Sequence, residues 1–210
     1  MTTGTDWYEL PVLSGRLVRL EPLGPQHAAG YLAAAGTGAQ AEEAFRWMYP
    51  PAPATLADAE EQIAVALAAR ERRERFAFAQ LEVGTEDTVI GTTSFYEVQP
   101  ELRSLAIGHT WLGPRWWRKG HNTESKLLLL THAFETLGAA RVVWHTDINN
   151  VRSQEAIARL GATREGELRK HRIRRDGSWR TTVQYSMTDD DWPAARDRLQ
   201  TRLAEGLRAS

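Results

Sequence analysis

The stretch Trp111-Leu-Gly-Pro-Arg-Trp-Trp-Arg-Lys-Gly-His-Asn-Thr-Glu-Ser-Lys126 is the most informative part of this chain. A strand-like segment ends at the start of this stretch, a short basic loop follows, and an amphipathic helix starts directly after the loop. The first amides of a helix lack intrahelical partners, and the helix dipole adds positive potential there. With Arg115, Arg118, Lys119 and Lys126 nearby, this helix start is suited to a pyrophosphate. A basic loop before a helix is also common on solvated surfaces, so the residues alone leave both interpretations open.

The composition is that of an ordinary globular protein and excludes several classes. The 210 residues are 42% hydrophobic and 25% charged, with a net charge of −1, so no global field favours DNA or a membrane. Cysteine is absent, which removes disulfides, thiolate zinc sites and cysteine nucleophiles. We expect no metal. Residues 1–10 do not resemble a signal peptide, and no apolar run approaches a membrane span. These features predict a soluble, cytoplasmic protein.

Hydrophobic patterning and turn residues predict strands and helices along the whole chain. In the first half we expect strands at 15–23, 76–83, 89–97 and 104–111, helices at 27–35 and 58–70, and a proline-rich loop at 49–53. In the second half we expect helices at 122–137, 150–160 and 190–207, and strands at 141–146, 167–174 and 179–188, the last two flanking the hairpin turn Asp176-Gly177.

This order of elements predicts the fold class. Antiparallel strands that lead into a βαβ unit indicate a mixed, mostly antiparallel sheet with helices on both faces, an α+β fold. No repeat or flexible linker interrupts the chain. We therefore expect one domain over residues 1–210, with a core over about 16–192 and a terminal helix over about 190–207.

Three segments resemble the GCN5-related N-acetyltransferases (GNATs), in particular the ribosomal-protein N-terminal acetyltransferase-like branch. The frame Arg115-Trp-Trp-Arg-Lys-Gly120 followed by Thr123-Glu-Ser125 is similar to the family's pyrophosphate loop. Residues 106–112 (AIGHTWL) are similar to the strand that splays to admit the pantetheine arm. Residues 150–153 with 156–162 resemble the Asn-x-x-Ser and Leu-Gly signature that follows.

The resemblance implies the GNAT fold, with about seven strands splayed in the middle, and acetyl-CoA as co-substrate. It also implies a set of cofactor-binding residues: Trp111, Leu112, Arg115, Arg118, Lys119, Gly120, His121, Asn122, Thr123, Asn150 and Ser153. A backbone amide within 108–111 would stabilise the oxyanion.

Two positions depart from the family pattern. Arg118 occupies the place of the loop's first glycine, a residue that permits unusual φ angles and close backbone approach. The guanidinium either compensates by contacting phosphate directly or cofactor binding is weakened. Many family members place a tyrosine where this chain has Ile157, which removes that proton donor for the thiolate.

Acid–base candidates follow from the resemblance and from ordinary pKa values. Ser153, in the first turn of its helix, matches a serine proposed to contact the CoA sulfur, although it equally suits a bond to its own backbone. For the amine's proton we consider His109, Glu97 and His145. A protein α-amine, with a pKa near 8, also needs little help from a base.

The functional prediction is an N-acetyltransferase that acts by direct attack in a ternary complex. The acceptor is a protein N-terminus or a small-molecule amine. The alternatives are a non-catalytic acyl-CoA-binding or interaction module, and an RNA-associated domain using the basic segment 169–175. If the segment does not bind RNA, it forms a solvated face, contacts an acidic acceptor, or contacts the 3′-phosphate of the cofactor. Related proteins often pair, so a homodimer is expected from the resemblance alone.

Overall fold

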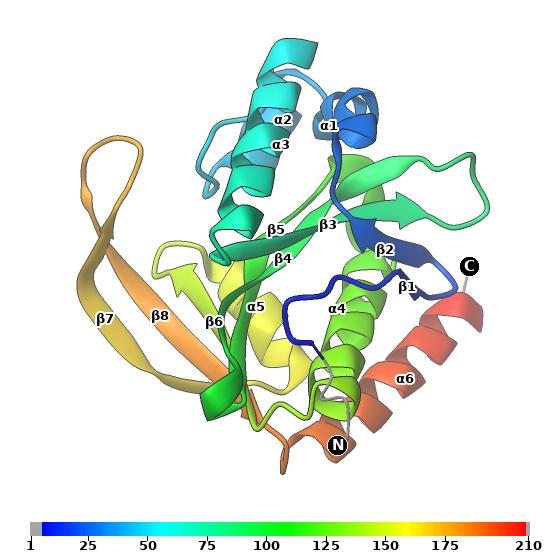
Figure 1. Ribbon diagram of the computed structural model, residues 1–210, viewed down its shortest axis with the longest axis vertical. Helices are drawn as coiled ribbons and strands as arrows, with labels where there is room; N and C mark the ends of the chain where they lie inside the picture. Colours follow the sequence, from blue (N-terminus) through cyan, green and yellow to red (C-terminus); the bar gives the residue numbers. More distant parts are fainter. Residues whose placement is uncertain (1–5, 209–210) are drawn as a thin grey trace.

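In the computed structural model, which describes residues 6–208, one open sheet of eight strands forms the centre of the molecule (Figure 1). Its spatial order is β1-β2-β3-β4-β5-β6-β8-β7, and every neighbouring pair is antiparallel except β5 and β6. The strands are β1 Leu13–Ser14, β2 Val18–Pro22, β3 Arg75–Glu82, β4 Val89–Gln99, β5 Ser104–Leu112, β6 Arg141–Asp147, β7 Thr163–Ile173 and β8 Trp179–Thr188.

Helices cover both faces of this sheet, as predicted. The first three lie above it and the last three below it in Figure 1, and the C-terminal helix packs on α4. Their bounds are α1 Ala28–Ala35, α2 Gly38–Phe45, α3 Leu56–Glu71, α4 His121–Thr131, α5 Val151–Leu160 and α6 Trp192–Arg208. Short 3₁₀ turns lie at Pro25–His27, Pro100–Leu102 and Pro114–Trp116, and a π-helical turn at His132–Thr136 extends α4.

The predicted seven strands are all present, and the two-residue β1 is the eighth. The predicted helix over 122–137 is α4 with its π-helical turn, and it ends at Gly138 with φ +69°, as a glycine stop requires. Sequence patterning missed α2. Its inward face consists only of Ala41, which is buried, and Phe45, which is 2% exposed, and this is too short a repeat to stand out between glycines and prolines.

The β7–β8 hairpin extends beyond the helical layers at one end of the sheet (Figure 1). Every residue of β7 except Gly166 is exposed, whereas β8 is mostly buried where it pairs with β6. Within the described residues, no helix is both long and apolar enough to cross a membrane.

Candidate active site

The sheet opens between its two parallel strands. Strand β5 pairs with β6 only from Ser104 to Ala106, against Arg141 to Val143. Beyond these residues β5 stays paired with β4, while β6 stays paired with β8, so the two strands diverge. This divergence confirms the predicted splay and leaves one edge of the second half of β5 without a strand partner among the described residues.

Helix α4 begins after the loop that follows β5, and no side chain caps it. The N-cap residue Gly120 has φ +87°, and the first helical hydrogen bond runs from the Glu124 amide to its carbonyl. By contrast, Thr55 caps α3 and Asn150 caps α5 with side-chain oxygens. The first amides of α4 are therefore available to donate hydrogen bonds to an anion.

The loop before α4 carries the predicted cations outward. Arg115, Arg118 and Lys119 are all exposed, and no ion pair of theirs occurs within the described part of the chain. Arg118 has φ +61°, the left-handed conformation that glycine adopts without cost. The backbone at position 118 thus has the conformation that glycine favours, although the residue is arginine.

The start of α5 lies beside this loop. The guanidinium of Arg152 stands 4.2 Å from the ring centroid of Trp117, and Trp117 Nε1 donates to the Leu112 carbonyl at 2.7 Å. Asn150 Oδ1 accepts the Ser153 amide at 3.1 Å, and Ser153 is half-buried. The structure therefore brings together the loop, the end of β5 and the Asn150–Ser153 turn.

Two of the predicted ligands and one predicted cation have buried side chains. The indole of Trp111 is buried, with its ring centroid 4.6 Å from that of Phe45. The imidazole of His121 is buried 3.6 Å from Glu82. Lys126 was expected to add a cation beside the phosphates, which was wrong: it is buried against the sheet, one turn too far along α4.

The acid–base candidates surround one residue that sequence reasoning missed, Tyr96. Its hydroxyl lies 2.9 Å from His145 Nδ1, and its ring centroid lies 5.3 Å from that of His109. Glu97 follows it directly and lies 3.8 Å from His145 Nδ1. Glu97 and His109 have φ of +49° and +48° at irregularities in β4 and β5, and strain of this kind is frequent at functional sites.

Positive charges face the same side of the sheet. Desolvation by the surrounding strands, then the charges of Arg75, Arg172 and Arg180, lower the pKa of His109 to about 3, although the residue as a whole is exposed. Its imidazole is therefore neutral near pH 7 but is a weak proton acceptor. Arg75 Nε donates to Ser94 Oγ at 2.9 Å, and no carboxylate of the described residues pairs with it.

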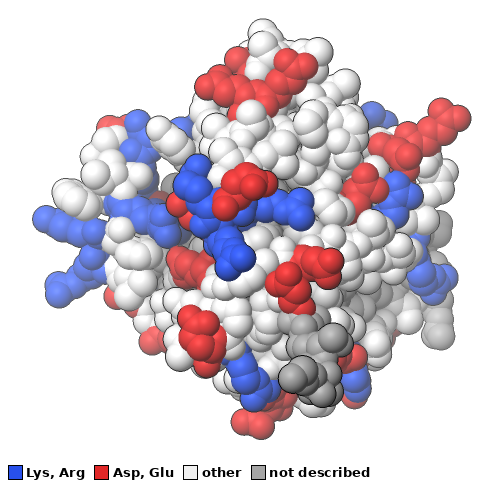
Figure 2. Space-filling model, in the orientation of Figure 1, with Lys and Arg blue, Asp and Glu red and all other residues white. Residues whose placement is uncertain are grey.

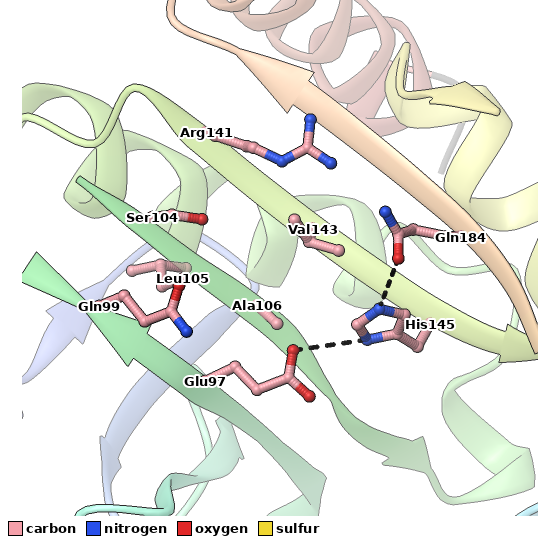
Figure 3. Close-up of a pocket in the computed structure, with 9 residues that line it drawn as sticks. All are labelled: Glu97, Gln99, Ser104, Leu105, Ala106, Arg141, Val143, His145 and Gln184. Atoms are coloured by element: carbon pink, nitrogen blue, oxygen red, sulfur yellow. Dashed lines mark hydrogen bonds and ion pairs between the residues drawn. The ribbon is translucent and has the colours of Figure 1, made fainter. Parts of the chain in front are cut away.

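A cavity of about 190 Å³ lies on this face, over the paired part of β5 and β6 (Figure 3). Glu97 and Gln184 point toward His145 from opposite sides, and Ser104, Arg141 and Val143 complete much of the wall. The cavity is polar and adjoins the apex of the splay, which suits a small polar group of an acceptor. Among the described residues, no three His, Asp or Glu side chains gather as metal ligands do.

The β7–β8 hairpin is strongly basic. Lys and Arg side chains gather at this end of the molecule (Figure 2). Arg174 and Arg180 pair with Asp147, and Arg172 lies 3.7 Å from Glu97. Arg169 and Lys170 are exposed. Part of the basic segment is thus a solvated face, and part of it borders the candidate site.

Comparisons with known proteins agree with this geometry. Residues 17–163 match the family model described as "Acetyltransferase (GNAT) domain". A GCN5-related N-acetyltransferase from Brucella melitensis has a crystal structure that superposes with a TM-score of 0.87 at 31% identity, covering 93% of this chain and 86% of that one. The crystal structure of the microcin C7 self-immunity acetyltransferase MccE, in complex with acetyl-CoA and AMP, superposes with a TM-score of 0.71 at 20% identity, covering 83% and 93%.

Among curated proteins, the [ribosomal protein uS5]-alanine N-acetyltransferase of Escherichia coli is 28% identical over 112 residues, 53% of this chain. The match spans 57% of the length of that relative.

An open sheet that splays beside an uncapped helix N-terminus defines the class of protein: an acyl-CoA-dependent acyltransferase fold. The chain belongs to the GNAT acetyltransferases, a family of acetyl-CoA-dependent enzymes.

Proposed function

We propose that this protein transfers the acetyl group of acetyl-CoA to a primary amine by direct attack in a ternary complex. The observation that carries the proposal is the uncapped start of α4, which follows a loop that lies between the end of β5 and the start of α5. Three cations of this loop, Arg115, Arg118 and Lys119, form no ion pair within the described residues. The amides of residues 121–123 and the side chains of Arg115, Arg118 and Lys119 would hold the pyrophosphate. Asn150 would contact the pantetheine arm, which would lie along the free edge of β5.

The chemistry requires an oxyanion donor and a proton for the thiolate. A free backbone amide within residues 108–111 would supply the first, because within residues 6–208 this part of β5 has no strand partner on the β6 side. Ser153, half-buried at the start of α5, would contact the sulfur in place of the tyrosine that Ile157 replaces.

The acceptor class is also a proposal. The name of the E. coli relative, which acts on an alanine of ribosomal protein uS5, favours a protein α-amine as the first acceptor to test. A small-molecule amine is the second, because the cavity beside His145 is only about 190 Å³. A homodimer, expected from the family resemblance, is to be tested by light scattering.

Thiol release with a panel of amines tests this function. Purified protein, acetyl-CoA and a thiol-reactive dye are combined with N-terminal peptides, amino sugars and polyamines. We expect release that depends on one amine class and that falls with Ser153→Ala. The exposed Ser178→Ala, in the β7–β8 turn, is the matched control. Saturable CoA binding without turnover on any amine would instead support a non-catalytic acyl-CoA-binding module.

A further inference from the structure

Tyr96 spans the opening between the splayed strands on one face of the sheet. It comes from β4, and its ring crosses β5 at Gly108, where a Cβ atom would lie only 2.8 Å from a ring carbon. Its hydroxyl then meets His145 of β6 at 2.9 Å. Gly108 follows the last paired residues of β5, and His145 follows those of β6. The phenol oxygen thus lies beside the apex of the gap.

A chain of hydrogen bonds defines which nitrogen of His145 carries the proton. Gln184 Nε2 donates to Glu165 Oε2 at 2.9 Å, which leaves Gln184 Oε1 as an acceptor. That oxygen lies 3.1 Å from His145 Nε2, so Nε2 carries the hydrogen in neutral His145. His145 Nδ1 is therefore the acceptor, and the Tyr96 hydroxyl donates to it.

The outer end of this chain of hydrogen bonds is Glu165, which carries a fixed negative charge. Two hydrogen bonds from Arg141, with further bonds from Gln184 and Ser186, lower the pKa of Glu165 to about 2. Glu165 therefore stays ionised over the whole working range of pH. Its negative charge orients the Gln184 amide.

We propose that Tyr96 is a catalytic residue of the acetyl transfer and that it passes the acceptor's proton to His145. The inference rests on the proposed function above. As the amine nitrogen forms its bond to the acetyl carbon, its proton moves to the Tyr96 oxygen while the phenol proton moves to His145 Nδ1. The carbon–sulfur bond then breaks, and the thiolate, which Ser153 would contact, takes back one proton along the same path. The products are the N-acetyl amine and the CoA thiol, with no net change in Tyr96 or His145.

The groups around His145 suit this cycle. Glu97 of β4 lies 3.8 Å from Nδ1. Arg172 of β7 pairs with Glu97 at 3.7 Å, Arg180 of β8 pairs with Asp147 at 4.0 Å, and the His171 ring of β7 lies 5.9 Å from that of His145. Desolvation raises the pKa of Tyr96, so the phenol remains neutral and acts as a relay rather than as a standing base.

Tyr96 also supplies a phenol, which helix α5 does not. In this chain α5 carries Ile157 where many relatives have tyrosine, and Ile157 is 7% exposed.

Three variants test the proposal: Tyr96→Phe, His145→Gln and, as the matched control, His171→Gln on the exposed strand β7. Each is measured for CoA affinity by calorimetry, for thermal unfolding, and for kcat and KM across pH with the best acceptor. Phenylalanine keeps the ring that spans the gap, and glutamine keeps a hydrogen-bonding partner for Tyr96 but takes up no proton.

We expect Y96F and H145Q to lower kcat roughly 10²-fold or more, with CoA affinity and unfolding temperature nearly unchanged. H171Q should keep the kcat of the unaltered protein. Turnover of Y96F within about threefold of the unaltered protein, or loss of CoA affinity in step with kcat, overturns the relay, because it reduces Tyr96 to a structural spacer. If the unaltered protein binds CoA but releases no thiol with any amine, the proposed function itself fails, and the relay fails with it.

Discussion

Lys126 donates from Nζ to Thr110 Oγ1 over 2.7 Å and so joins the helix that opens the proposed pyrophosphate site to the strand that borders the splay. A second bond, of 2.9 Å, reaches Thr93 Oγ1 on β4. The two threonine hydroxyls also bond to each other at 2.8 Å. No carboxylate of the described residues pairs with this buried ammonium group. A charge held this way is costly, because its only partners are neutral hydroxyls.

The first prediction concerns the pH dependence of stability. Burial lowers the pKa of Lys126 to about 7 from an ordinary value of 10.5. Between these values the unfolded chain binds more protons than the folded one, so the free energy of unfolding rises with pH, by at most about 1.4 kcal/mol per pH unit. Below pH 7 Lys126 is protonated in both the folded and the unfolded state, so the free-energy cost of burying its charge no longer changes with pH.

Lys126→Met should remove this rise, because methionine fills the same space without titrating. Urea unfolding of both proteins at several values between pH 7 and pH 10 measures the difference, and the exposed Lys170→Met serves as control. Parallel curves for the unaltered protein and K126M would contradict a lowered pKa at this site.

The second prediction separates the backbone from the side chain at Arg118. Its φ of +61° costs any L-residue roughly 1 kcal/mol relative to glycine. Arg118→Ala removes the guanidinium and keeps the strain, whereas Arg118→Gly removes both. We therefore expect R118G to be more stable than R118A by up to about 1 kcal/mol, a difference that the entropy of glycine in the unfolded chain reduces.

Both Arg118 variants should bind CoA several-fold more weakly than the unaltered protein, because each lacks the proposed phosphate contact. Calorimetric titration with CoA measures this loss. Tighter binding by R118G than by the unaltered protein would show that the arginine obstructs the loop instead of holding the phosphate.

Sequence reasoning was most successful where neighbouring residues determine the conformation. The Asp176-Gly177 turn, the Asn150 cap and the Gly138 stop each depend on a few adjacent side chains, and all three are present. The splay followed from the family resemblance, and local pattern alone did not indicate it.

The site residue that was missed, Tyr96, depends on a contact distant in sequence. Tyr96 and His145 are 49 residues apart and meet only because β5 lies between their strands. The burial of Lys126 depends on which face of α4 packs on the sheet, and in a short basic segment the sequence left that face ambiguous. The helical spacing of Ser125, Leu129 and Lys126, all buried, was the available clue.

The third prediction concerns Glu124, which anchors the chain before β2 to the start of α4. Its carboxylate accepts the amides of Arg16, Leu17 and Val18 at 2.9, 2.6 and 2.8 Å, and the residue is 5% exposed. Glu124→Gln replaces an acceptor oxygen by an NH₂ group that faces amide donors. We expect a loss of about 3 kcal/mol in the free energy of unfolding.

Urea unfolding measures the effect of E124Q, with Glu60→Gln on the exposed face of α3 as the control. A change below about 0.5 kcal/mol, the usual range for surface substitutions, would mean that these three amides find other partners.

The last prediction uses Gly108, whose missing side chain makes room for the Tyr96 ring. A Cβ atom there would lie 2.8 Å from one ring carbon and 3.5 Å from the hydroxyl oxygen, so Gly108→Ala must displace the ring. The backbone of Gly108 is not in the left-handed region, and alanine therefore adds bulk without adding strain. A shift of the phenol away from His145 breaks their 2.9 Å contact.

We expect G108A to lower kcat toward the level of Y96F, and G108A/Y96F to be little worse than Y96F alone, because the two changes act on one group. Gly166→Ala, where nothing lies within 4 Å of the added methyl group, is the control. Multiplicative losses in the double variant would mean that Gly108 acts through the strand and its amides instead of through Tyr96.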